Sequence, residues 1–288
     1  MIAKKSGLMD RLDLQISNLK TLRPFDSSNK ISNAFGVFYH LDKEYSKRYN
    51  GKRMLLKYDT DKQSIKEKTI NLENLYNSKL YDVKELVIPE KLAYIENKCI
   101  GYILPLIEGV NLGDYLYDDK ININDKLKHL KQLCLLVDKV HKIKTKYGNF
   151  IFTDLHPGNF VIDNEDNSLK AIDLDSGTFH KDKVFSKKYL IDKNCNITAN
   201  KNIDLLMLNT IVINFIAKTR IDLFNDEQKN KYYDYLQSIG ISKKIINYFK
   251  AVSSDYLKNV NPLTYLDELS SNKNIAKANI MLYNLRKQ

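Results

Sequence analysis

The segment from residue 152 to residue 175 constrains the fold of this chain more than any other, because turn residues, apolar runs and carboxylates alternate in it at short spacing. Two apolar runs, at 160–162 and 169–172, flank the polar stretch Asp-Asn-Glu-Asp-Asn-Ser. Short runs of this kind on either side of turn residues predict a β-hairpin. Folding the hairpin carries Asp173 back toward the loop that precedes it.

That loop carries two further polar side chains, Asp154 and Asn159, with a Pro-Gly pair between them that favours a turn. Closing the hairpin therefore brings two carboxylates and one amide oxygen together. Hard cations, above all Mg²⁺, take such oxygen ligands when they hold nucleotide phosphates. Each residue alone is an ordinary turn residue, and only the combined spacing predicts a phosphate-transfer site with one carboxylate left for an acceptor hydroxyl.

The stretches Asp-Leu-His-Pro-Gly-Asn and Ile-Asp-Leu-Asp resemble the catalytic and metal loops of protein kinases and of their atypical and aminoglycoside phosphotransferase relatives. The resemblance implies an α+β, bilobal protein kinase-like fold. Residues 1–108 would form a small β-rich N-lobe with a leading helix and a hinge, and residues 109–288 a mainly helical catalytic C-lobe. It also implies that Asp154 is the catalytic aspartate, and that Asn159 and Asp173 are metal ligands.

The chain departs from typical protein kinases at Phe152 and Thr153, which stand where those enzymes have His-Arg. No arginine is therefore present there to be engaged by a phosphorylated activation loop. The stretches Leu-His-Pro-Gly-Asn and Ile-Asp-Leu-Asp-Ser are more similar to atypical bacterial kinases and small-molecule phosphotransferases. An Ala-Pro-Glu motif, part of a familiar peptide-docking platform, is also absent between Asp173 and Asp204.

Kinase-like folds hold the α and β phosphates of ATP with a lysine on an upstream strand. Lys57 fits this position, because it ends the apolar run Met-Leu-Leu and follows an Asn-Gly hairpin signal that pairs this strand with residues 37–41. Gly36 matches the Phe-Gly of a glycine-rich loop, whereas Ile31 and Asn33 replace its first two glycines. Taken alone, Lys57 would be a surface lysine and Gly36 a turn residue.

The resemblance further implies a helical glutamate that pairs with Lys57. A helix is predicted over residues 64–81, because apolar residues recur along one face of it. Glu67 has the usual sequence context and is our first choice, with Glu73 as the alternative. For either residue, a solvated side chain is the simpler interpretation.

Two more strands are predicted between residues 86 and 109, and they lead into the linker where a kinase-like fold binds adenine. Aligned on that pattern, Leu104 is the gatekeeper, Pro105 offers its carbonyl to the adenine amine, and Ile107 offers its N–H and carbonyl. Proline fits a position that uses only the carbonyl.

Helical periodicity continues through the rest of the chain. An amphipathic helix is predicted over 124–142, where His141 has a packing role rather than a catalytic one. An apolar helix predicted over 202–217 begins with Asp204 and resembles the buried helix whose aspartate fixes the catalytic loop through backbone hydrogen bonds. Other helices are predicted over 8–22, 226–240, 242–254 and 262–286.

The formal net charge of +11 raises the question of nucleic-acid binding. Only six basic residues are arginine, and the lysines are scattered among Asp and Glu without clustered aromatic residues, so binding to nucleic acid is not predicted. The three cysteines match no metal-ligand spacing, no apolar stretch is long enough to span a membrane, and the N-terminus lacks a secretory signal. These features favour a cytoplasmic protein without a membrane span.

The sequence thus predicts a phosphotransferase that uses ATP and Mg²⁺, most similar to an atypical protein serine/threonine kinase. A small-molecule kinase of the aminoglycoside or choline type is the alternative enzyme, so the acceptor is a protein or a small-molecule hydroxyl. The degenerate glycine-rich loop favours a third alternative, a nucleotide-binding pseudokinase that serves as a scaffold. Against it stand the intact residues Lys57, Asp154, Asn159 and Asp173.

Overall fold

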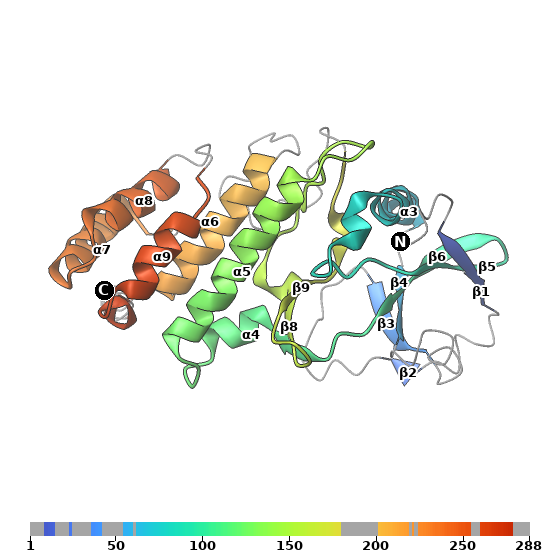
Figure 1. The fold of residues 1–288 in the computed structure, drawn as a ribbon, viewed down its shortest axis with the longest axis horizontal. Coiled ribbons are helices and arrows are strands. Elements are labelled where there is room, and N and C mark those ends of the chain that lie inside the picture. Colours follow the sequence, from blue (N-terminus) through green and yellow to red (C-terminus); the bar gives the residue numbers. More distant parts are fainter. Residues whose placement is uncertain are drawn as a thin grey trace.

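The chain has a mixed α+β fold (Figure 1). The larger β-sheet lies at one end, the C-terminal helices lie at the other, and a smaller sheet lies between them. Among the described residues, no helix combines the length and the apolar character needed to cross a membrane. This computed structural model describes residues 9–14, 23–24, 36–41, 54–59, 62–179, 201–218, 221, 224–254 and 260–278.

Six described strands form the larger sheet, in the order β1-β5-β6-β4-β3-β2. They are β1 (Asp10–Asp13), β2 (Arg23–Pro24), β3 (Gly36–His40), β4 (Met54–Asp59), β5 (Lys91–Ile95) and β6 (Lys98–Pro105). Strand β4 pairs antiparallel with β3, which confirms the pairing predicted from the Asn-Gly signal. On its other side β4 pairs with β6, so that Lys57 lies between Phe38 and Tyr102 in the middle of the sheet.

The first strand corrects the prediction of a leading helix over residues 8–22. Residues Asp10–Asp13 are extended and pair in parallel with Lys91–Tyr94 of β5. The edge of β5 offers backbone hydrogen bonds to this segment, and the long-range pairing outweighs the local helical periodicity. The remainder of the predicted helix, from residue 15 to residue 22, lies outside the described residues.

Helix α3 (Lys62–Tyr76) packs against β6 of the larger sheet. It is shorter than the predicted helix, because a separate 3-10 turn, η1 (Lys79–Asp82), follows it. The Ser78 side chain caps this turn by accepting a hydrogen bond from the Leu80 N–H. Helix α3 also contacts another 3-10 turn, η3 (Leu174–Ser176), from the second half of the chain.

The smaller sheet contains the predicted hairpin. Its strands are β7 (Gly109–Asn111), β8 (Phe160–Asp163) and β9 (Leu169–Ala171), in that order. Strands β8 and β9 are antiparallel, with Phe160 opposite Ala171, so the prediction is confirmed. Strand β7 leads directly into α4 (Leu112–Tyr117), whose first turn is capped by the Asn111 side chain.

The remaining elements are helical. They are α5 (Ile123–Lys142), α6 (Lys201–Ala217), α7 (Asp226–Ser238), α8 (Lys243–Ser254), α9 (Leu263–Ser271) and the 3-10 turn η5 (Ile275–Lys277). Helix α6 is apolar on nearly all sides and contacts both α5 and α8, as expected of a helix inside the core (Figure 1). The helix predicted over 262–286 ends at Ser271, and residues 279–288 lie outside the described part of the chain.

Candidate functional site

Two hydrogen bonds bring three of the predicted site residues together. The Ile172 N–H donates to the Asn159 carbonyl oxygen at 2.8 Å, which places Asn159 beside Asp173 at one end of the β8–β9 hairpin. The Asn159 side-chain amide donates to the Asp154 carbonyl oxygen, also at 2.8 Å, and ties the preceding loop to the hairpin. These two bonds link the loop of Asp154 and Asn159 to the end of the hairpin next to Asp173.

Asp204, in the first turn of α6, holds this loop through hydrogen bonds to its backbone. Its fully buried carboxylate accepts the Phe152 N–H at 2.9 Å and the Thr153 N–H at 3.1 Å. The His141 ring donates to the same carboxylate at 2.8 Å. The prediction that Asp204 fixes the loop through backbone hydrogen bonds is confirmed, and His141 of α5 hydrogen-bonds to the same Asp204 carboxylate.

Two non-glycine residues of the site have left-handed backbone conformations. Thr153 has φ of 57° and Asp173 has φ of 58°. A β-branched residue such as threonine rarely adopts this region, and the surrounding contacts must hold it there. The Thr153 hydroxyl does so by donating to the Ser176 carbonyl oxygen at 2.6 Å, which also joins the loop to η3.

Asp154 carries a buried carboxylate oxygen, Oδ1, that accepts no hydrogen bond. Its other oxygen, Oδ2, lies 3.8 Å from Nε2 of His156. Because Nδ1 of His156 accepts the Gly158 N–H at 3.1 Å, the proton of a neutral ring is on Nε2, facing Asp154. Asp154 thus has Oδ2 near a ring N–H, whereas its Oδ1 is buried without a hydrogen-bond partner.

Lys57 enters the same site from the larger sheet. Its side chain is only 4% exposed, and its ammonium group donates to Asp173 Oδ1 and, at 3.1 Å, to Asp175 Oδ2. Lys68 of α3 lies 3.3 Å from the same Asp175 oxygen. The structure therefore joins the larger sheet, α3 and η3 through one cluster of two lysines and two aspartates.

Burial and charge shift the pKa values of this cluster. Burial opposes the charged form of Lys57, but Asp175 and Asp173 outweigh it and raise the pKa of the lysine above its ordinary value. Burial, together with the charge of Asp175, raises the pKa of Asp173. Burial also opposes ionisation of Asp175, yet Lys57 and Lys68 hold the pKa of this carboxyl below its ordinary value.

The structure does not bring the predicted helical glutamates to Lys57. Glu67 is on an exposed part of α3, and Glu73 is half-buried, with its pKa raised by burial. Among the carboxylates of the described residues, those within ion-pair distance of Lys57 belong to Asp173 and Asp175. Asp175 is a site residue that the sequence does not reveal, because the resemblance assigns a role only to the first aspartate of the Asp-Leu-Asp stretch.

The residues predicted to contact the nucleotide base and phosphates lie along β3 and β6. Gly36 begins β3 opposite Asp59, and residues 31–35, the rest of the predicted glycine-rich loop, lie outside the described residues. Leu104 is buried on β6, Pro105 ends that strand, and Ile107 packs against the core just beyond it.

Two polar side chains of the site, Asn159 and Asp173, are the candidates for holding a divalent cation. Asn159 donates through its amide nitrogen, which leaves its carboxamide oxygen as a hard ligand beside Asp173. No group of three His, Cys, Asp or Glu side chains arranged for metal binding occurs among the described residues. Mg²⁺ matches such a set, because it commonly takes one or two protein carboxylates and completes its shell with water and phosphate oxygens.

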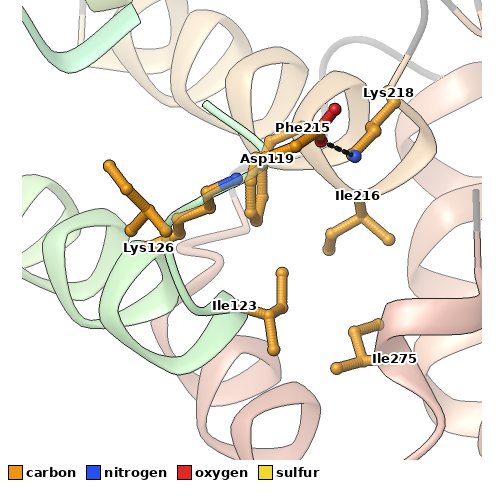
Figure 2. Close-up of a pocket in the computed structure, with 8 residues that line it drawn as sticks. Asp119, Ile123, Lys126, Phe215, Ile216, Lys218 and Ile275 are labelled. Carbon is orange, nitrogen blue, oxygen red and sulfur yellow. Dashed lines mark hydrogen bonds and ion pairs between the residues drawn. The ribbon is translucent and has the colours of Figure 1, made fainter. Parts of the chain in front are cut away.

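A separate pocket of about 210 Å³ lies at the other end of α6 (Figure 2). Ile123, Phe215, Ile216 and Ile275 form its apolar walls, and an ion pair of 2.6 Å between Lys218 and Asp119 crosses its rim. At 1.5 Å per residue, Phe215 lies roughly 16 Å along the helix axis from Asp204. This pocket contains none of the predicted site residues.

The site around Asp173 thus combines a buried lysine, the Asp154 carboxylate with an unsatisfied oxygen, and the Asn159 amide and Asp173 carboxylate at the end of the hairpin. A scan against protein-family models and a search of the curated proteins found no match to this chain. What these residues can do chemically therefore follows from their own geometry.

Proposed function

We propose that this chain is an ATP- and Mg²⁺-dependent phosphotransferase of the protein kinase-like superfamily. The larger sheet with α3 would be its small lobe, and α4 to α9 would belong to its catalytic lobe. The observation that supports the proposal most strongly is the contact of Lys57 with Asp173, 116 residues further along the chain, beside the loop that carries Asp154 and Asn159. This combination of a lysine, a general base and two metal ligands is what phosphoryl transfer requires.

In the proposed mechanism each side chain has one task. Asp154 orients the acceptor hydroxyl and takes its proton on a carboxylate oxygen. Asn159 and Asp173 hold Mg²⁺, which when bound neutralises charge on the phosphates. Lys57 binds the α and β phosphates, for which it must exchange its contact with Asp173 for phosphate oxygens.

We propose a protein serine or threonine hydroxyl as the first choice of acceptor. A small-molecule hydroxyl is the second, favoured by the Leu-His-Pro-Gly-Asn stretch and by the absence of an Ala-Pro-Glu motif between Asp173 and Asp204. We also propose a cytoplasmic location, because Cys99 and Cys134 are both free thiols, as is usual in a reducing compartment.

Mass spectrometry of the purified protein incubated with Mg-ATP tests these proposals. The protein alone, a mixture of serine- and threonine-containing peptides, and a panel of small hydroxylated compounds would be compared, with Asp154→Asn as the inactive control. Phosphorylation of the chain or of peptides supports a protein kinase, and phosphorylation confined to a small compound supports the second choice. Nucleotide binding without any transfer in all three arms would contradict both and favour a scaffold.

A further inference from the structure

We infer that Asp175, and not a glutamate of α3, is the positioning residue for Lys57, and that Lys68 of α3 fixes Asp175 in that task. The inference rests on the proposed function, in which Lys57 binds phosphate. In this arrangement α3 contributes a positive charge to the site, Lys68, instead of the glutamate that the resemblance implies.

Asp173 and Asp175 differ in the exposed fraction of their side chains, and this difference indicates different roles. Asp173 is 27% exposed, whereas Asp175 is 1% exposed and lies 3.1 Å from the Lys57 ammonium group. A metal ligand must reach the open side of the site, and Asp173 can turn toward a cation there. Asp175 can keep its contact of 3.1 Å with Lys57 while Asp173 leaves. Lys57 therefore has a permanent partner and an exchangeable one.

Lys68 explains how Asp175 is held. The ammonium groups of Lys57 and Lys68 both lie within 3.3 Å of Oδ2 of Asp175, so this oxygen balances two positive charges. Without Asp175, two buried or half-buried cations would face each other, which is strongly unfavourable at low dielectric. Contact between α3 and η3 provides the packing that keeps the three groups in register.

The arrangement predicts which substitution disturbs nucleotide binding. Asp175→Asn removes the permanent partner of Lys57, so Lys57 samples other positions and binds phosphate less well. We expect the KM for ATP to rise roughly tenfold with kcat within about threefold, since a tenfold change corresponds to one charge-assisted hydrogen bond of about 1.4 kcal/mol. Asp175→Glu, which keeps the carboxylate, restores most of the loss. Loss of folded protein would instead lower kcat at unchanged KM.

Glu67→Gln is the matched comparison, because it makes the same carboxylate-to-amide change on the helix where the anion was expected. We expect the KM for ATP of this variant to stay within twofold of the wild type. The double variant Lys68→Met/Asp175→Asn removes the buried pair together and is expected to fold even if Asp175→Asn alone does not. It is expected to show the same rise in KM.

A second measurement needs no nucleotide. The ammonium resonance of Lys57, assigned by its loss in Lys57→Met, is expected to be visible by ¹⁵N NMR in the wild type and in Glu67→Gln, because ion pairing slows exchange of its protons. It is expected to shift and broaden in Asp175→Asn. A rise in KM and loss of the resonance in Glu67→Gln, with neither in Asp175→Asn, would overturn the inference. Failure of the wild type to bind Mg-ATP would contradict the proposed function, while the resonance would still decide whether Asp175 holds Lys57.

Discussion

At the level of single residues, the most informative group is the Oδ1 oxygen of Asp154. It is buried and accepts no hydrogen bond, although an unsatisfied buried acceptor costs about 1–3 kcal/mol. The neighbouring Thr153 adds a left-handed backbone that other contacts must hold. Such costs are expected at a position where a ligand completes the hydrogen bonding, and the acceptor hydroxyl fits that description.

Asp154→Asn is expected to lower kcat by a factor on the order of 10²–10⁴, the range that a general base contributes. Binding of ATP should be unchanged, because Asp154 is assigned to the acceptor and not to the phosphates. Steady-state kinetics and calorimetric titration of ATP measure the two quantities. Asp166→Asn, which changes an exposed aspartate on the β8–β9 hairpin that follows this loop, is the matched control and should retain full activity. Full activity of Asp154→Asn would show that another group takes the proton.

His156 is expected to orient Asp154 through its Nε2 proton. His156→Asn keeps an acceptor for the Gly158 N–H but removes the donor that faces Asp154. We expect kcat to fall on the order of tenfold, less than loss of the base itself, with an unchanged KM for ATP. If His156→Asn matches the wild type while His156→Ala loses activity, the ring serves only to cap the turn.

At the level of elements, α6 supports the catalytic loop through a single side chain. Asp204→Ala leaves the Phe152 and Thr153 N–H groups and the His141 ring without their acceptor. We expect a loss of about 3 kcal/mol in the free energy of unfolding, measured by urea denaturation.

Asp138→Ala on α5 is the control for this change, because it removes an exposed ion pair with Lys142 and should cost less than about 1 kcal/mol. Equal losses in the two variants would mean that the Asp204 carboxylate does not fix the loop.

The elements that the sequence predicts well are those determined by local signals. The β8–β9 hairpin follows from turn residues between two apolar runs, and α6 follows from its apolar composition and leading aspartate. Strand β1 could not be predicted, because its pairing depends on a free edge of β5, which lies far away in the sequence. Local periodicity carries no information about such an edge.

The partner of Lys57 could not be predicted for a similar reason. Glu67 and Lys68 are adjacent on α3, and a rotation of the helix by one residue decides which of them faces the site. That rotation is set by packing of α3 against β6 and η3. Sequence context predicts Glu67 as the partner of Lys57, whereas the packing of α3 brings Lys68 to Asp175.

At the level of the whole molecule, the site joins parts of the chain that fold around different sheets. Lys57 belongs to the larger sheet, and the loop with Asp154 is fixed by α6 at the far side of the smaller one (Figure 1). The Lys57 contacts with Asp173 and Asp175, and the packing of α3 on η3, connect the two. A change in the packing of α3 on η3 would alter the distance between Lys57 and Asp154, the residues proposed to bind phosphate and to act as the base.

The site is expected to be active without prior phosphorylation. Thr153 stands where typical protein kinases have the arginine that an activation-loop phosphate engages, and it is buried, with its hydroxyl donating to the Ser176 carbonyl oxygen at 2.6 Å. No basic side chain is therefore present immediately before Asp154 for a phosphate group to neutralise. Phosphatase-treated protein should therefore transfer phosphate without a lag in a stopped time course. A lag that disappears after preincubation with ATP would indicate that another basic residue receives a phosphate.

Calorimetric titration of ATP with and without Mg²⁺, on the wild type and on Asp173→Asn, examines the site as a whole. We predict that the wild type binds Mg-ATP at least tenfold more tightly than ATP in the presence of a chelator, because Asn159 and Asp173 hold the cation against the phosphates. Asp173→Asn should lose that dependence on Mg²⁺ and remain folded. No binding of ATP by the wild type, or the same Mg²⁺ dependence in Asp173→Asn, would contradict a phosphotransferase site at this position.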